Sequence, residues 1–403
     1  MVPKLRFKEY TDKWTLSTLS EAAVQIIDGD RGANYPSSDD FSSSGYCLFL
    51  NAGNVTKDGF KFDDVAFITE EKDALLRKGK ISRGDLVLTT RGSVGNAALY
   101  NNDIYFENIR INSGMVIIRT QKKISPDFLY EYFKSNFFST WLSKVAFGSA
   151  QPQLSVKIIN ELSIYFPESS EQSRIGNFLL AVDKKIALLD KQYKLLRQYK
   201  KGMMQNIFSQ VLRFKNESGE VFPEWEPKQL SDIAMINPKN KELPSEFIYI
   251  DLESVEKGQL LKEQLILKKD APSRAQRLLL PGDVLFQLVR PYQNNNYIFF
   301  LRGNYVASTG YAQLRANYNP QFLYQLLHLE SFTSEVMNRC TGTSYPAINS
   351  SDLASIEIEI PSEKEQIKIA SFLSTIDDKI AVKKAELDKL KTWKQGLLQQ
   401  MFI

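Results

Sequence analysis

The residues that could perform chemistry in this 403-residue chain are few and isolated. Its one histidine, His328, lies in an apolar run with helical spacing, where a packed helix residue is a more common role than a general base. Cys47 and Cys340 are too few and too far apart for a disulfide framework or a zinc site. The segment RGSVGN (91–96) lacks the lysine of a phosphate-binding loop, and MINPKNK (235–241) lacks the second proline and the aromatic residue that a DNA amino-methyltransferase uses to hold a flipped base. These absences predict a noncatalytic chain.

The composition is that of an ordinary globular protein, with 43% hydrophobic and 24% charged residues, and the length predicts two or more domains. No apolar run approaches the roughly 20 residues that a membrane span needs, and the N-terminus lacks a signal-peptide core, so we expect a cytoplasmic protein. Residues 171–215 carry ten Lys and Arg against three Asp and Glu. This basic segment could meet phosphates, or it could be the solvated face of a helix.

The chain is a tandem repeat. A shift of 194 positions aligns residues 167–208 with 361–402 without a gap, and about 15 of the 42 positions are identical. Upstream, SPDFLYEYF (125–133) aligns with NPQFLYQLL (319–327) in the same register. The period is too long for a solenoid unit, so the repeat predicts two similar domains, each followed by a helix.

Each repeated segment has the heptad spacing of a coiled coil, with apolar residues at alternating steps of four and three. We call these positions the helix seam: Ile175, Leu179, Val182, Ile186, Leu189 and Leu196 in the first copy, and Ile369, Leu373, Ile376, Ile380, Leu387 and Leu390 in the second. Lys200 and Lys394 interrupt the two seams at equivalent places. Neither helix is stable alone, and two covalently joined copies favour a pseudo-twofold arrangement, so we expect the two helices to pair antiparallel.

Both helices are also preceded by a proline and a sequence with the S-x-x-E/Q spacing of a capping box. Ser169 pairs in this way with Gln172, and Ser362 with Glu365. The spacing predicts that each glutamine or glutamate side chain bonds the first turn of its own helix.

The globular halves are expected to be α+β. Strand-like runs occur at 46–55, 85–90, 114–120 and 247–252, and runs with helical spacing occur at 128–142 and 322–336. The predicted architecture is therefore two similar α/β domains separated by an antiparallel coiled coil of two long helices. The predicted boundaries are 1–168 for the first domain, 169–212 for the first helix, 213–361 for the second domain and 362–403 for the second helix.

These features resemble the specificity subunit of type I restriction–modification systems. Both helices open with P-x-x-x-EQ (167–172 and 361–366), continue FL…(V/I)D.KIA and end KG(M/L)(M/L)Q..F or its close variant, and both domains begin with an R-F…W…L segment. The resemblance covers the whole chain. It implies two target recognition domains that each read one half of an asymmetric bipartite double-stranded DNA site, and spacer helices that set the half-site distance and dock two modification (methyltransferase) subunits. Restriction or translocase subunits complete such complexes, and S-adenosylmethionine, ATP and magnesium belong to the partner subunits. No metal, cofactor or membrane role is expected for this chain.

Polar loops between the structured runs are the candidates for reading bases, because bidentate Arg–guanine and Asn or Gln–adenine contacts carry most direct readout. In the first domain the candidates are Arg31, Asn34, Tyr35, Thr90, Arg91, Ser93, Asn96, Ser149, Gln151 and Gln153. In the second domain they are Gln287, Arg290, Tyr292, Gln293, Asn294, Asn295, Thr343, Ser344, Tyr345 and Asn349. Arg91 and Arg290 stand out because each follows a strand that comes after the same Gly-Asp turn.

Each loop has a plainer interpretation as an ordinary polar turn. Two further interpretations of the whole chain stay open at this point. A free-standing methyltransferase or nuclease is disfavoured by the missing motifs, and a coiled-coil scaffold that binds no DNA leaves the unequal polar loops unexplained.

Overall fold

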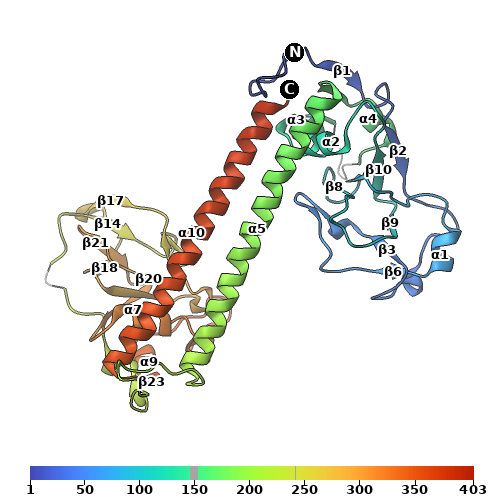
Figure 1. The fold of residues 1–403 in the computed structure, drawn as a ribbon. Helices are drawn as coiled ribbons and strands as arrows, with labels where there is room; N and C mark the ends of the chain where they lie inside the picture. Colours follow the sequence, from blue (N-terminus) through green and yellow to red (C-terminus); the bar gives the residue numbers. More distant parts are fainter. Residues whose placement is uncertain (146–152, 241) are drawn as a thin grey trace. The chain divides into compact units, whose positions relative to one another are not determined.

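The structure is a computed structural model that describes residues 1–145, 153–240 and 242–403, and Figure 1 shows its course. The chain forms two compact units. The first unit contains Met1–Lys191 and Ala385–Ile403, and the second contains Gln192–Lys384. Each unit therefore holds one globular domain and one half of each long helix. The predicted division into four consecutive segments stays a prediction.

The first globular domain is built on a four-stranded antiparallel sheet with the order β2-β10-β7-β8. Its strands are β2 (Gln25–Asp28), β10 (Met115–Arg119), β7 (Leu86–Thr89) and β8 (Ala97–Leu99). A three-stranded sheet contains β6 (Phe67–Ile68), β3 (Cys47–Leu50) and β9 (Ile109–Ile111), and its strands β3 and β9 are parallel. Two antiparallel pairs complete the strands: β1 (Thr15–Thr18) with β11 (Ser163–Phe166), and β4 (Val55–Thr56) with β5 (Gly59–Phe60). The helices are α1 (Glu70–Leu75), α2 (Pro126–Phe133), α3 (Asn136–Val145) and α4 (Val156–Asn160), with 3-10 turns at Ser38–Asp40 and Ala52–Asn54.

The second domain repeats this plan. Its antiparallel sheet has the order β13-β22-β19-β20, from β13 (Ala234–Ile236), β22 (Tyr311–Ala316), β19 (Asp283–Gln287) and β20 (Tyr297–Ile298). The other sheet has the order β17-β14-β21-β18, from β17 (Gln264–Leu267), β14 (Glu246–Ile250), β21 (Tyr305–Ser308) and β18 (Ala275–Leu278), with β14 and β21 parallel. The pairs are β12 (Glu226–Gln229) with β23 (Glu357–Ile360), and β15 (Val255–Glu256) with β16 (Gln259–Leu260). The helices are α6 (Leu230–Ile233), α7 (Pro320–Leu326), α8 (Glu330–Asn338) and α9 (Ser350–Ala354), with 3-10 turns at Lys268–Asp270 and Pro291–Gln293.

The middle residues of the central strands β7 and β19 are apolar because both faces of these strands are buried. In β7, Leu86 and Leu88 join the cluster that α2 and the long helices share, while Val87 joins the cluster of the three-stranded sheet. In β19, Val284 and Phe286 face the equivalent helical cluster and Leu285 faces the second sheet. Each antiparallel sheet is therefore the middle layer of its domain.

The long helices are α5 (Ser169–Phe208) and α10 (Glu363–Met401), and in each unit they pair antiparallel, as predicted (Figure 1). In the first unit Lys394 Nζ lies 2.5 Å from Asp183 Oδ1. In the second unit Lys200 Nζ lies 2.6 Å from Asp377 Oδ1. The two pairs are related by the repeat, so both halves of the helix pair have the same register. The seam residues are buried or half-buried along both helices.

The C-terminal end of each helix packs into the domain that belongs to the other repeat. The Phe402 ring lies 5.2 Å from the Phe128 ring of α2, and the Phe208 ring lies 5.7 Å from the Phe322 ring of α7. Beside these contacts the backbone N–H of Leu5 donates to Gln400 O at 2.9 Å, and that of Leu212 donates to Asn206 O at the same distance. We call Phe402 and Phe208 the anchor phenylalanines.

The P-x-x-x-EQ motif at the start of each helix does not form the predicted capping boxes. Gln172 Nε2 donates to Pro167 O at 2.8 Å, and Gln366 Nε2 donates to Pro361 O at 3.0 Å, so a glutamine satisfies the carbonyl of the proline before the helix. Glu365 accepts both Nε and Nη2 of Arg213, and Glu171 is held in the same way by Arg6. The glutamate side chain thus bonds the R-F segment of its own unit rather than the helix terminus.

Each run with helical spacing at 128–142 and 322–336 is divided into two helices. In the first domain α2 ends at Phe133, and the hydroxyl of buried Ser135 accepts the N–H of Phe138 as α3 begins. In the second domain α7 ends at Leu326 and α8 begins at Glu330. In the first domain the serine interrupts an apolar period that would otherwise continue, whereas in the second the N-cap of α8 is Leu329 and makes no side-chain capping bond.

Candidate nucleic-acid interface

The predicted loops of the first domain gather at one end of the four-stranded sheet, around the turn at 112–114. Arg31 Nη2 donates to Ser113 O at 3.3 Å, and the Ser113 N–H donates to the Tyr35 hydroxyl at 3.3 Å. The N–H of Thr90 donates to Gly114 O, and the N–H of Leu154 donates to Thr90 O. Three loops that are distant in sequence, 28–35, 89–96 and 153–155, therefore form one surface.

Within this surface some predicted readers support the loops from inside. Thr90 is buried, and its hydroxyl donates to Gly114 O at 3.0 Å. Asn96 is half-buried and its side-chain amide donates to Val55 O at 3.1 Å. Tyr35 packs its ring on Phe49. Their polar groups make hydrogen bonds within the protein and support the loops, and base contact by Thr90, Asn96 and Tyr35 stays a prediction.

The exposed candidates of the first domain are Arg31, Asn34, Arg91, Ser93 and Gln153. Arg31 also pairs with Asp28 at 3.2 Å. With the Gln153 amide oriented so that its oxygen faces Arg91, that oxygen accepts from Nε at 3.2 Å and from Nη2 at 3.0 Å. Ser149 and Gln151 lie outside the described residues.

In the second domain, loops 287–296 and 341–349 meet at the equivalent end of the sheet. The N–H of Arg290 donates to Pro346 O at 2.7 Å, and the N–H of Ile348 donates to Leu288 O at 3.1 Å. Val289 and Ala347 form an isolated bridge. The two loops are therefore a single backbone-bonded unit.

Gln287 supports this unit from inside. It is 3% exposed, and its Nε2 donates to Val289 O at 2.7 Å and to Gln293 Oε1 at 2.9 Å. Its Oε1 accepts the N–H of Asn295, and its own N–H donates to the buried Asn296 side chain. These groups all bond within the loop, and base contact by Gln287 stays a prediction.

Several neighbours of Gln287 also have internal partners. Asn294 Oδ1 accepts from the Thr333 hydroxyl at 3.3 Å, and Asn295 Oδ1 accepts the N–H of Lys257 at 3.0 Å. Asn349 is the N-cap of α9, and its Oδ1 accepts the N–H of Asp352 at 2.8 Å. Asn349 thus caps a helix in this structure, and its predicted base contact stays a prediction.

The candidates that remain exposed in the second domain surround Arg290. Tyr292, Gln293, Thr343, Ser344 and Tyr345 are exposed, and Arg290 itself is half-buried. The Arg290 guanidinium carbon lies 4.2 Å from the centroid of the Tyr345 ring. Each domain thus presents an arginine from the loop after its central strand, with a side chain of the second loop beside it.

Sequence reasoning missed the ion pairs beneath these loops. Asp85, at the start of β7, accepts Nε and Nη2 of Arg119 at 2.8 and 2.6 Å. Asp283, at the start of β19, accepts the same atoms of Arg315 at 2.8 and 2.9 Å. Each carboxylate is almost fully buried and fixes the strand that leads to the arginine loop. The Gly-Asp turn shared by both domains is the sequence feature that could have indicated these ion pairs, because its aspartate is the one that bonds the arginine.

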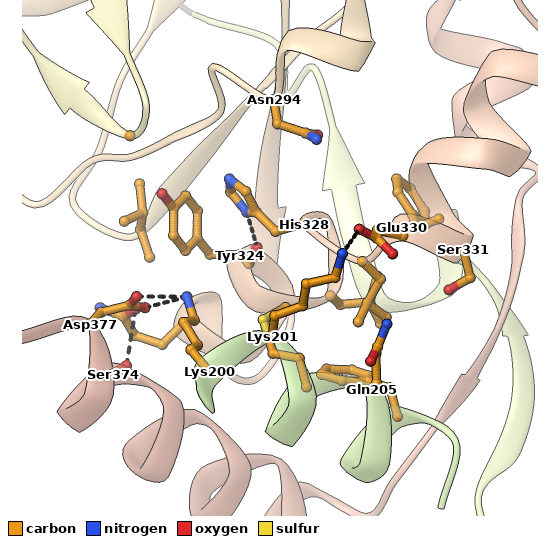
Figure 2. Close-up of a pocket in the computed structure, with 18 of the residues that line it drawn as sticks. Lys200, Lys201, Gln205, Asn294, Tyr324, His328, Glu330, Ser331, Ser374 and Asp377 are labelled. Atoms are coloured by element: carbon orange, nitrogen blue, oxygen red, sulfur yellow. Dashed lines mark hydrogen bonds and ion pairs between the residues drawn. The ribbon is translucent and has the colours of Figure 1, made fainter. Parts of the chain in front are cut away.

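A groove of about 1920 Å³ lies in the second unit between the helices and the domain. In Figure 2 the side chains of Lys200 and Lys201 reach carboxylates: Lys200 contacts Asp377, and Lys201 Nζ lies 2.6 Å from Glu330. His328 has Nδ1 2.8 Å from Tyr324 O, and burial lowers the pKa of this imidazole. The histidine is therefore a neutral packed residue, and the paired lysines leave the groove without a phosphate cradle.

Among the described residues no group of three or more His, Cys, Asp or Glu side chains could hold a metal ion. In the same part of the chain, no helix is long and apolar enough to cross a membrane. Burial also raises the pKa of the Cys47 thiol to about 12, and the neighbouring Asp73 acts in the same direction, so this cysteine is a packed residue.

The comparison with known families agrees with this architecture. The family described as "Type I restriction modification DNA specificity domain" matches residues 12–198 and 223–392, which is most of both repeats. The chain belongs to this family. Both matched regions include one domain and part of the helix that follows it, so the family pattern and the internal repeat coincide.

Two relatives and one solved structure extend the similarity along the chain. The MjaVIII specificity subunit of a type I restriction enzyme from Methanocaldococcus jannaschii is 26% identical over 378 residues, covering 88% of this chain and 84% of that protein. The MjaIX specificity subunit of the same organism is 25% identical, covering 79% and 77%. The crystal structure of the S subunit of a type I restriction–modification system from M. genitalium superposes with a TM-score of 0.66 at 16% identity, covering 100% of this chain and 99% of that one. This likeness supports the fold of the specificity family.

Proposed function

We propose that this protein is the noncatalytic DNA-recognition subunit of a type I restriction–modification complex in the cytoplasm, and that each domain reads one half of a bipartite double-stranded target. The observation that carries the proposal is the arginine loop, which both domains place at the same end of the same sheet. Arg91 has Gln153 beside it, whereas Arg290 has Tyr345. Because the two reading surfaces differ in chemistry, the two half-sites differ in sequence.

The long helices set the distance between the half-sites in this proposal. A helix of 40 residues is about 60 Å long at 1.5 Å per residue, and half-sites one turn of DNA apart are separated by roughly 34–36 Å. A paired helix is stiffer than an extended linker, and it therefore restricts the register in which two recognition domains can bind.

The helices also carry exposed apolar residues at repeated positions. Leu188 and Val382 are equivalent in the repeat, and so are Tyr199 and Trp393; all four are between 48% and 58% exposed. A solvated helix face does not need large apolar residues at the same place in both copies. We assign these positions to the docking of two copies of one partner, the modification subunit. Under this proposal the S-adenosylmethionine, ATP and magnesium chemistry belongs to the modification and restriction subunits.

The test is selection from a pool of random duplexes by the chain assembled with its modification subunits. We expect a split target with two defined halves. Arg91→Ala should weaken the base preference in one half and Arg290→Ala in the other, each by about 10–100-fold if the contact is bidentate. Selection of no sequence, or equal losses on specific and random DNA, would refute base reading by these loops.

Two further measurements separate the alternatives. Exchange of residues 213–361 for the second domain of another family member should change one half of the target and leave the other half intact. The purified chain incubated with labelled S-adenosylmethionine and target DNA should transfer no methyl group until a modification subunit is added. Methyl transfer by the chain alone would establish an enzyme instead.

A further inference from the structure

We propose that Tyr345 is a positioning residue that holds Arg290 ready to read a guanine in the second half-site. This inference rests on the proposed function of the second domain and assigns separate roles to two neighbouring residues. Arg290 is the reader, whose N–H groups match the O6 and N7 acceptors of guanine. Tyr345 acts through Arg290 and makes no base-specific contact of its own.

The backbone fixes where the Arg290 side chain begins. Arg290 has φ +54° and ψ +54°, in the left-handed region that a non-glycine residue rarely occupies. The conformation costs of order 1 kcal/mol or more and needs support from its surroundings. That support is present, because the Arg290 N–H donates to Pro346 O at 2.7 Å and its own carbonyl accepts the N–H of Gln293 at 3.0 Å.

The loop around Arg290 is held from below by Gln287. This buried side chain bonds Val289 O on one side of Arg290 and Gln293 on the other. Asn294, at the far end of the turn, is also left-handed with φ +51°. The neighbours of both left-handed residues, Val289, Gln293 and Asn295, bond the buried Gln287 side chain, which fixes the shape of the turn.

The side chain of Arg290 is then fixed by stacking and by nothing else. Its guanidinium carbon is 4.2 Å from the centroid of the Tyr345 ring, within the range of a cation–π contact. Within the described part of the chain the guanidinium has no hydrogen-bond acceptor or carboxylate partner. Arg315 and Arg213, by contrast, are each engaged by a carboxylate through two bonds. Arg290 is thus oriented while its N–H edges stay free.

Stacking is suited to this task because it uses the face of the guanidinium and leaves its edges available. A bidentate contact with guanine needs two parallel N–H groups in the plane of the fork. In the first domain Gln153 accepts Nε and Nη2 of Arg91, so part of that fork is already occupied. We therefore expect a stronger guanine preference at the base read by Arg290 than at the base read by Arg91.

The experiment is random-site selection followed by competition binding, with the assembled complex and five variants. Arg290→Ala should lower the preference for guanine over other bases at one position by about 10–100-fold. Tyr345→Ala should lower the same preference by about 3–5-fold, the size of an exposed cation–π contact, without changing which base is preferred. Tyr345→Phe should behave as the wild type, because the ring and not the hydroxyl does the stacking. The double variant Arg290→Ala/Tyr345→Ala should equal Arg290→Ala.

Tyr318→Ala is the matched control. Tyr318 is a tyrosine of the same domain with a similar exposure, it lies outside the two polar loops, and the Arg290 guanidinium stacks on Tyr345. Its removal should leave the guanine preference unchanged. Thermal unfolding of every variant shows whether the domain is intact, and Tyr345→Phe keeps the test valid if Tyr345→Ala unfolds.

Two outcomes would overturn the inference. An additional loss in the double variant would show that Tyr345 contacts DNA itself, and an unchanged preference in Tyr345→Ala would show that the ring does not position Arg290. Both differ from failure of the proposed function, in which the wild-type complex selects no second half-site at all.

Discussion

A buried group of four charges joins the helices to the first domain, and its neutralisation can be tested in detail. Lys134 Nζ lies 3.1 Å from Glu131 and 2.5 Å from Asp183, and Lys394 Nζ lies 2.9 Å from Glu131 and 2.5 Å from Asp183. The Glu131 side chain is fully buried. Burial raises its pKa, and the two lysines oppose that shift. Two positive and two negative charges therefore balance in a nearly dry site.

The second unit contains the same group with a different composition. Position 131 is Gln325 in the repeat and position 134 is His328, while Asp377 and Lys200 replace Asp183 and Lys394. Gln325 Nε2 donates to Asp377 Oδ2 at 2.7 Å. One carboxylate and one lysine remain, and the two neutral residues each make a hydrogen bond, Gln325 Nε2 to Asp377 and His328 Nδ1 with Tyr324 O. The loss of a negative charge is accompanied by the loss of a positive one.

We predict that Glu131→Gln destabilises the first unit because it leaves two lysines facing one carboxylate. Removal of one partner from a buried pair costs about 3–5 kcal/mol, and the partial exposure of Asp183 and Lys134 reduces this to about 2–3 kcal/mol. The double variant Glu131→Gln/Lys134→His restores the charge balance of the second unit. It should recover most of the loss.

Amide hydrogen exchange of the full-length chain is the assay, since it reports each unit separately. Glu131→Gln should speed exchange in residues 385–401 by roughly 30–150-fold, at 1.4 kcal/mol for each factor of ten. Residues 363–384 of the same helix, which belong to the second unit, serve as the internal control. Equal protection in Glu131→Gln and the wild type, or no recovery in the double variant, would refute the charge-balance argument.

Three other predictions concern the packing of the units. Burial lowers the pKa of His328, so the folded chain excludes a proton that the unfolded chain binds. The second unit should therefore lose stability as the pH falls below about 6.5, by at most about 1.4 kcal/mol per pH unit. Urea titrations at several pH values measure this slope, and His328→Gln should remove it. Gly176→Ala places a Cβ 2.8 Å from the Asp127 side chain and 3.1 Å from its backbone, and should cost about 1–3 kcal/mol in thermal unfolding. The Cβ of Gly202→Ala meets nothing within 4 Å, and this variant should gain up to about 1 kcal/mol. A stabilised Gly176→Ala would contradict the close approach of the helix. Phe402→Ala should cost about 3–5 kcal/mol and increase exchange in the first unit only, and a matching increase in the second unit would show that the units do not unfold independently.

The helix pair could be predicted from the sequence because its information is periodic. The seam from Ile175 onward and its copy from Ile369 predict the length of each helix and its pairing with the other copy. The internal repeat predicts that the two helices pair antiparallel. The predicted capping boxes of Gln172 and Glu365 were wrong, because Gln172 bonds the carbonyl of Pro167 and Glu365 is held by Arg213 from a distant segment of the chain. Periodicity reports which face is buried, and it gives no information on such contacts.

The candidate loops could be selected from the sequence as polar segments, but their exposed and buried residues could not be distinguished. Thr90, Gln287 and Arg290 are all polar residues that follow a buried strand, and nothing in their types separates them. The separation comes from backbone geometry: Thr90 and Gln287 point toward neighbouring carbonyls, while the left-handed turn at Arg290 directs its side chain to the Tyr345 ring. Positive φ at an arginine is not indicated by the residue type, because the non-glycine residues enriched in this region are Asn, Asp and His.

The anchor phenylalanines determine how such a protein can acquire a new target. Phe208, together with Met204 and Ile207, lies in the apolar cluster of the second unit although it is encoded upstream of that domain. An incoming domain obtained by recombination would therefore have to offer a fitting site, such as the Phe322 face of α7, to a residue it did not bring with it. Arg290 and Tyr345 lie outside this apolar cluster, so a change of either side chain leaves the junction intact. The helix junction of the domain therefore preserves the fold, while a separate part of the same domain, the loops around Arg290, can change the target.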